Sequence, residues 1–136
     1  MSTEENLRIT ERFVEAFNAQ NWTQFSELLT EDASYDSPIH PEPLKGNSAF
    51  VQYFKDIFVA YPDCKAETHR LFGQGNNICW EGALTGTHEG PIRDIAPTHK
   101  SVRIPFCHIY TFKDGKISDA VVFLDRLGYF SQLGIQ

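Results

Sequence analysis

The pattern of apolar and polar positions changes its period near the middle of the chain. Before Pro62, apolar residues recur three and four positions apart, which is the spacing of one face of an α-helix. After Pro62, apolar and polar residues alternate, as they do along a strand with one buried face. The pattern therefore predicts an α+β fold in which helices come first and an antiparallel sheet follows.

Three helices are expected in the N-terminal half. Ser2 and Glu5 fit a capping box at the start of the first helix. Asn21 can cap a second, short helix. A third helix begins near residue 47 and ends before Pro62. The aromatic residues expected to be buried on these helices are Phe13, Phe17, Phe54 and Phe58.

Four strands are expected in the second half. Residues 63–74 alternate weakly, residues 78–88 alternate more clearly, and the clearest alternation runs from Val102 to Phe112. A DG pair then predicts a two-residue hairpin turn, after which residues 117–125 return antiparallel. A flat strand of ten or more residues would span about 35 Å, so the sheet must curve strongly to fit a small domain. Three helices on its concave side would make a cone that encloses an apolar pocket.

Composition narrows the class of protein. The chain has 136 residues, and we expect a single domain over residues 1–136. A formal net charge of −6, without a Lys/Arg cluster, argues against a nucleic-acid partner. No apolar run approaches the roughly 20 residues of a membrane span, and the acidic N-terminus does not resemble a secretory signal. We therefore expect no membrane association and a cytoplasmic location.

The sequence offers no pattern for a metal or a cofactor. The five histidines are scattered, and neither HxH nor HExxH occurs. Cys64, Cys79 and Cys107 are isolated from one another and are expected to be reduced thiols. A glycine-rich phosphate loop and a GxSxG elbow are also missing. Any chemistry should therefore rest on the protein's own side chains, with no metal and no cofactor.

The predicted hairpin brings two polar residues to one face of the sheet. With a two-residue turn and no irregularity, His108 lies opposite Val121. Side chains alternate faces with a period of two. The face of His108 would therefore also carry Tyr110, Asp119, Val121, Phe123 and Asp125.

Asp125 and His108 each allow two interpretations. A carboxylate in apolar surroundings holds its proton tightly, so Asp125 would suit a general acid or base. Alternatively, Asp125 caps a helical tail through a free amide near Gly128. His108 is either a pocket residue or a hydrogen-bonded core residue. If Asp125 is a general acid or base and His108 is a pocket residue, the two are the candidate catalytic pair.

Further residues are candidates for the wall of the pocket. Trp80 and His88 share one strand face, although Trp80 also suits simple packing. His40 lies in a proline-rich loop, where it could reach the mouth of the cone or face water. Tyr35 begins a short extended piece and could project inward. The candidate lining residues are Tyr35, His40, Trp80, His88, Phe106, Tyr110 and Phe123.

Several short motifs follow one another along nearly the whole chain. A helix ends near Tyr61-Pro62-Asp63, GTHEG occupies residues 86–90, and DGKI occupies residues 114–117. Asp125 then precedes a tail that contains the QLG of residues 132–134. In this order and spacing the chain resembles the SnoaL-like polyketide cyclases of the nuclear transport factor 2-like superfamily.

The resemblance implies an α+β cone that is commonly dimeric through the outer face of its sheet. In the characterised cyclases, an acidic residue on the late strand performs acid–base work in a cofactor-free intramolecular aldol closure. Asp125 is the position matched to it, with Asp119 as the alternative. The superfamily also contains isomerases, dehydratases, epoxide hydrolases and members without known activity. Many relatives carry Trp where this chain has Val121 or Val122, which implies an altered pocket floor.

Three functions are open at this point. An enzyme would use Asp125 as proton shuttle and His108 as its partner, or as donor to a developing enolate oxygen, on an apolar carbonyl compound. A binding protein would use the same pair only to orient an apolar small molecule. A scaffold would have a filled cone. A cavity of roughly 300 Å³ or more would favour a ligand over a scaffold.

A homodimer is the expected assembly. In the predicted register, the face opposite the pocket carries Ile109, Thr111 and Val122. These residues would form an apolar and polar surface suited to a second copy of the chain.

Overall fold

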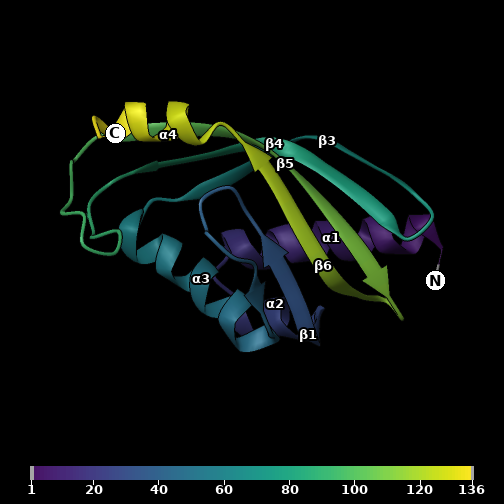
Figure 1. Cartoon of the computed structure of the whole chain (residues 1–136). Coiled ribbons are helices and arrows are strands. Elements are labelled where there is room, and N and C mark those ends of the chain that lie inside the picture. Colours follow the sequence, from purple (N-terminus) through teal and green to yellow (C-terminus); the bar gives the residue numbers. More distant parts are fainter. Residues whose placement is uncertain (1, 136) are drawn as a thin grey trace.

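The computed structural model describes residues 2–135 and confirms the α+β fold (Figure 1). Helices α1, α2 and α3 cover one face of a strongly curved sheet, and α4 lies at the end of the last strand. The elements in chain order are α1 (Thr3–Asn18), α2 (Trp22–Glu27), β1 (Leu29–Asp36), β2 (Leu44–Lys45), α3 (Asn47–Ala60), β3 (Lys65–Gln74), β4 (Asn77–Thr87), β5 (Ser101–Lys113), β6 (Lys116–Leu124) and α4 (Arg126–Leu133).

Local sequence explains where the helices begin and end. The amide of Glu5 donates to Ser2 Oγ at 3.1 Å, and the Glu5 carboxylate accepts from the Ser2 amide, which confirms the capping box. Asn21 caps α2 as predicted, because its Oδ1 accepts from the Gln24 amide at 3.2 Å. The third helix ends just before Pro62, which has no amide hydrogen to continue it.

The sheet is mixed rather than wholly antiparallel. Its six strands over residues 2–135 have the order β2-β1-β6-β5-β4-β3, so it has two free edges and is not closed. Strands β3 to β6 form the antiparallel meander that the alternating pattern predicts. The difference is β1, which pairs with β6 in parallel. Most of the chain lies between β1 and β6. A local pattern of residues does not determine the relative direction of two strands so far apart in sequence.

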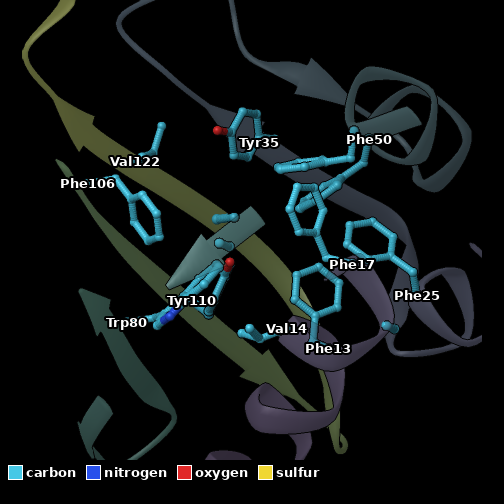
Figure 2. Close-up of a cluster of buried hydrophobic side chains, with 14 of the residues drawn as sticks. Phe13, Val14, Phe17, Phe25, Tyr35, Phe50, Trp80, Phe106, Tyr110 and Val122 are labelled. Carbon is cyan, nitrogen blue, oxygen red and sulfur yellow. The ribbon is translucent and has the colours of Figure 1, made fainter. Parts of the chain in front are cut away.

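The core between helices and sheet is built from aromatic rings. Phe13 and Phe25 stack with centroids 4.2 Å apart, and Phe50 contacts both rings edge-on. Figure 2 shows these rings facing Trp80 and Tyr110 from the sheet. The four phenylalanines that the helical spacing predicts to be buried are indeed buried: Phe13, Phe17, Phe54 and Phe58.

The register of the β5–β6 hairpin departs from the sequence expectation. The turn is as predicted, and Lys113 pairs with Lys116. A bulge at Ser118 then shifts the pairing by one residue, and the Ser118 hydroxyl donates to the Thr111 carbonyl at 3.0 Å. His108 therefore lies opposite Val122 instead of Val121. Because side chains alternate faces, this single extra residue reverses the face of every β6 side chain that follows it.

Candidate functional site

A cavity of about 80 Å³ lies between the sheet and the helices. We call it the inner cavity. Its walls are mostly aromatic, which makes the space apolar. The side chains that matter most for its chemistry and shape are Tyr35, Phe54, Trp80, Phe106, His108 and Tyr110.

A second space of about 380 Å³ adjoins the inner cavity. We call it the outer vestibule. The two spaces share five wall residues: Ile39, Tyr53, Ile57, Tyr61 and Tyr129. The outer vestibule is more polar than the inner cavity, because its wall also includes His40, Asp56, Arg93 and Arg126. Its volume exceeds the roughly 300 Å³ typical of small-molecule sites, whereas that of the inner cavity alone does not.

Two tyrosines meet where the spaces adjoin. The hydroxyls of Tyr61, which follows α3, and Tyr129, on α4, are hydrogen-bonded at 2.6 Å. Burial raises the pKa of both hydroxyls, so both stay protonated. Helix α4 is held against β5 by Gln132, whose side chain accepts from the Arg103 amide at 2.7 Å and donates to the Arg103 carbonyl at 2.9 Å. The tail thus holds Tyr129 at the boundary between the two spaces.

His108 projects from β5 into the wall of the inner cavity. Its ring is 6% exposed and packs against Phe106 at 4.8 Å and Trp80 at 5.1 Å between centroids, with Tyr110 and Tyr35 slightly farther away. Within residues 2–135, its buried Nδ1 has no hydrogen-bond partner. Burial lowers the pKa of His108 to about 3, so the imidazole is neutral at physiological pH. A neutral imidazole here can offer hydrogen bonds to a ligand without placing a charge in the apolar space.

Asp125 does not share a face with His108, and the register that placed them together is wrong. The bulge at Ser118 turns Asp125 away, and its exposed side chain caps α4 by accepting from the Gly128 amide at 2.9 Å. The capping interpretation of Asp125 is thus confirmed. The alternative acid, Asp119, is also exposed and accepts from Ser34 Oγ at 2.6 Å.

Phe123 is likewise misplaced by the predicted register. Its ring is 58% exposed on the outer face of the sheet and is absent from the walls of both spaces. Val122, which was expected on the outer face, is buried and lines the inner cavity. The physical reason is the same one-residue bulge in β6.

The other predicted lining residues divide between the two spaces. Tyr35, Trp80, Phe106 and Tyr110 line the inner cavity, and Trp80 Nε1 donates to Thr68 Oγ1 at 2.8 Å. His40 lines the outer vestibule, as expected for a residue at the mouth.

His88 is buried but lies in the wall of neither space. Its Nδ1 accepts from the Thr98 amide at 3.1 Å, which fastens the loop before β5 to the end of β4. The hydrogen bond from Thr98 and the absence of His88 from both walls indicate that His88 has a structural role rather than a lining role.

Substitution of Asp125 tests the cap. Asp125→Asn should leave stability nearly unchanged, because Asn caps a helix about as well as Asp. Asp125→Ala should lower the free energy of unfolding by about 1 kcal/mol, because the Gly128 amide loses its partner. Urea denaturation of both variants measures the difference. If Asp125→Asn lowered the free energy of unfolding as much as Asp125→Ala does, the capping role would be contradicted.

Several side chains of the site were missed by sequence reasoning. Tyr53 and Tyr129 line both spaces, and Arg93 and Arg126 line the outer vestibule. The sequence carried a weak signal only for the tyrosines, which stand among other apolar residues.

Over residues 2–135, no group of three or more His, Cys, Asp or Glu side chains is arranged to hold a metal ion. In the same range, no helix is long and apolar enough to cross a membrane.

The sequence matches the profile of a known family. The profile of the SnoaL-like polyketide cyclase family matches residues 7–133, which is nearly the whole chain. No curated protein matches the sequence at a significant level.

Comparison with solved structures gives many similar folds. A SnoaL-like candidate polyketide cyclase from Jannaschia sp. CCS1 has a TM-score of 0.89 at 18% identity, over 98% of this chain and 94% of that one. IdmH, a candidate polyketide cyclase from Streptomyces antibioticus, has a TM-score of 0.81 at 20% identity, over 96% and 99%. An LEH-like epoxide hydrolase from M. tuberculosis has a TM-score of 0.77 at 18% identity, over 96% and 90%. At such identities the likeness establishes a shared fold.

Proposed function

The chain belongs to the SnoaL-like polyketide cyclase family, and we propose that it is a cofactor-free enzyme that converts an apolar, carbonyl-bearing small molecule by acid–base chemistry. The family and the neighbouring folds support a small-molecule-converting enzyme. The substrate class and the role of individual residues are our proposal.

One observation carries the proposal, and it is the state of His108. Buried polar atoms in proteins almost always have a hydrogen-bond partner. Within residues 2–135 the buried Nδ1 of His108 has none, although the ring stands in the wall of a cavity. Burial of an unpaired nitrogen costs free energy of folding, and an apolar residue would pack equally well at this position. The presence of His108 here is therefore better explained by a ligand that binds it than by a contribution to folding.

The proposed role of His108 is to stabilise a developing enolate. A neutral imidazole can donate its N–H to a carbonyl oxygen, and the negative charge that grows on this oxygen strengthens the bond. The proton on the neighbouring carbon is thereby made more acidic and passes to water in the outer vestibule. The resulting carbanion can attack a second carbonyl of the same molecule. A carbon–carbon bond forms as the π bond of that carbonyl breaks, and the alkoxide takes back a proton from the water, which completes an intramolecular aldol closure. The apolar walls support this step, because a hydrogen bond is stronger where water is excluded.

Asp125 has no part in this proposal. The bulge that turns it outward and its bond to Gly128 leave it far better explained as a helix cap. His108 therefore acts without a carboxylate partner in our scheme.

A non-catalytic binding protein is the second candidate. It is favoured by the same absence of a carboxylate beside His108 within residues 2–135, because the proton then has only water as its acceptor, and water is a poor base. Hydrogen–deuterium exchange separates the two candidates. NMR spectra of cyclic aryl ketones such as 2-tetralone in D₂O should show that protons next to the carbonyl exchange faster with the protein than in buffer alone. Binding without faster exchange would favour the binding protein, and neither effect would reject both candidates.

We also propose that two copies of the chain associate through the outer face of the sheet. Phe72, Cys79, Ile109 and Val121 lie opposite one another on four neighbouring strands and form a continuous stripe. Phe123 lies beside this stripe, and its ring and that of Phe72 are more than half exposed. Val122 has no part in this surface, because it faces the helices.

A charge placed in the stripe should break the dimer. Phe123→Arg should sediment at the 15.5 kDa of one chain, whereas the parent should sediment at twice that mass at micromolar concentration. The matched control is Val59→Arg, because Val59 is equally exposed but lies on α3, across the sheet from the stripe. A parent that sediments as a single chain, or a control that dissociates as Phe123→Arg does, would contradict the proposed interface.

A further inference from the structure

The outer vestibule carries two arginines without acidic partners. Arg93 and Arg126 both line it, and neither forms an ion pair within residues 2–135. The acid in the same wall, Asp56, is engaged on its own helix, where its Oδ1 accepts from Gln52 Nε2 at 2.8 Å. Two guanidinium groups thus face one space in a chain whose formal net charge is −6.

Arg126 is held in place over an apolar surface. Its guanidinium carbon lies 5.0 Å from the centroid of the Phe130 ring, a cation–π contact. Phe130 belongs to the same vestibule wall. A guanidinium that stacks on an aromatic face keeps its N–H groups directed outward in its own plane, where they are free to bind an anion.

Arg93 is held in place by a tight loop. Its φ of 53° lies in the left-handed region, which is unfavourable for a residue other than glycine. The loop is closed by Ile92 and Ile95, whose amides donate to each other's carbonyls at 3.0 and 2.8 Å. Functional positions often keep such local strain.

His40 lies in the same vestibule wall as Arg93. Burial is the main reason that the pKa of His40 is lowered, and the Arg93 guanidinium lowers it further. The Nδ1 of His40 is buried and has no hydrogen-bond partner within residues 2–135. The wall therefore presents one unpaired polar nitrogen beside two unpaired cations.

We propose that the outer vestibule is an anion subsite, in which Arg93 and Arg126 bind the carboxylate of a ligand whose apolar body extends past Tyr61 and Tyr129 toward His108. This inference rests on the proposed function for the position of the ligand in the inner cavity. It specifies the substrate class as apolar organic acids. The planar fork of a guanidinium matches the two oxygens of a carboxylate and forms charge-assisted hydrogen bonds with them.

The ligand must part the two tyrosines. An apolar cavity of about 150 Å³ holds a benzene ring, and the inner cavity measures about 80 Å³. An aromatic body therefore fits only if it also occupies the space where Tyr61 and Tyr129 now meet at 2.6 Å. Their hydroxyls lose one hydrogen bond and become available to the ligand.

Two probes that differ only in charge test the subsite. We expect 2-naphthylacetate to bind the full chain about tenfold more tightly than 2-naphthylacetamide at low salt, in NMR titrations. The double variant Arg93→Gln/Arg126→Gln should lose this preference and keep the affinity for the amide. The double variant Arg8→Gln/Arg12→Gln is the control, because it removes an equal charge from two exposed sites on α1.

Specific outcomes would overturn the inference. Equal binding of the two probes, no binding of either, or a preference that survives in the double variant would each reject the subsite. A preference lost equally in Arg8→Gln/Arg12→Gln would assign the effect to overall charge. Tighter binding of 2-naphthyl phosphate than of 2-naphthylacetate would reject the assignment to carboxylates. Because these titrations measure binding at equilibrium, they decide the subsite whether or not the ketone exchange assay detects activity.

Discussion

His108→Phe should abolish proton exchange in the ketone assay and leave the protein folded and at least as stable as the parent. Removal of a general acid–base group or of an oxyanion donor typically lowers a rate by about 10² to 10⁴-fold. Stability should not fall, because Phe preserves the ring while removing a buried nitrogen that has no partner within residues 2–135. Exchange rates by NMR and melting temperatures by calorimetry, measured on the same samples, check both parts.

His108→Gln provides the matched control. The amide of Gln can donate a hydrogen bond into the inner cavity, so this variant should retain part of the rate that Phe loses. The parent rate should also show no titration of His108 between pH 5 and pH 8, because burial lowers the pKa of His108 to about 3 and the ring stays neutral throughout. If His108→Phe were unstable but fully active per folded molecule, His108 would have a structural role and not a catalytic one.

The features that the sequence predicted correctly depend on short stretches of chain. The capping box of Ser2 and Glu5, the Asn21 cap and the DG turn each involve residues two to four positions apart. Their geometry is therefore determined by neighbours in the sequence. The buried phenylalanines of the helices follow from the same local periodicity.

The largest error in the predicted site has a local cause with long-range consequences. Nothing in the alternation of β6 indicates the bulge at Ser118, since Ser118 is compatible with either face of a strand. Once the bulge is present, His108 gains Val122 as its neighbour and loses the predicted face shared with Asp125 and Phe123. Because of this one extra residue, Asp125 does not lie beside His108, and the ring of Phe123 is exposed on the outer face of the sheet.

The rest of the site depends on tertiary structure. The contact between Tyr61 and Tyr129 joins side chains 68 positions apart, and no pattern in the sequence connects them. Arg93 and Arg126 share a wall only because α4 and the loop before β5 meet α3 at the same end of the cone. Charged residues in loops are usually solvated surface, so their position around a cavity has to be observed.

Phe50→Ala should cause the largest loss of stability among the substitutions considered for this protein, about 3 to 5 kcal/mol of unfolding free energy. Phe50 is fully buried, and its ring contacts Phe13, Phe25, Tyr35 and Phe54. Its removal leaves a space that rigid rings on both layers cannot easily fill. Urea denaturation with tryptophan fluorescence measures the loss.

Val59→Ala is the control on the same helix. Val59 is more than half exposed, so its truncation should change the unfolding free energy by about 0.5 kcal/mol or less. Phe50 lines neither the inner cavity nor the outer vestibule, so the folded fraction of Phe50→Ala should keep the exchange activity that His108→Phe loses. The two substitutions should therefore have opposite effects, one on stability alone and one on activity alone. If Phe50→Ala were as stable as Val59→Ala, the aromatic cluster would not be the main support of the cone.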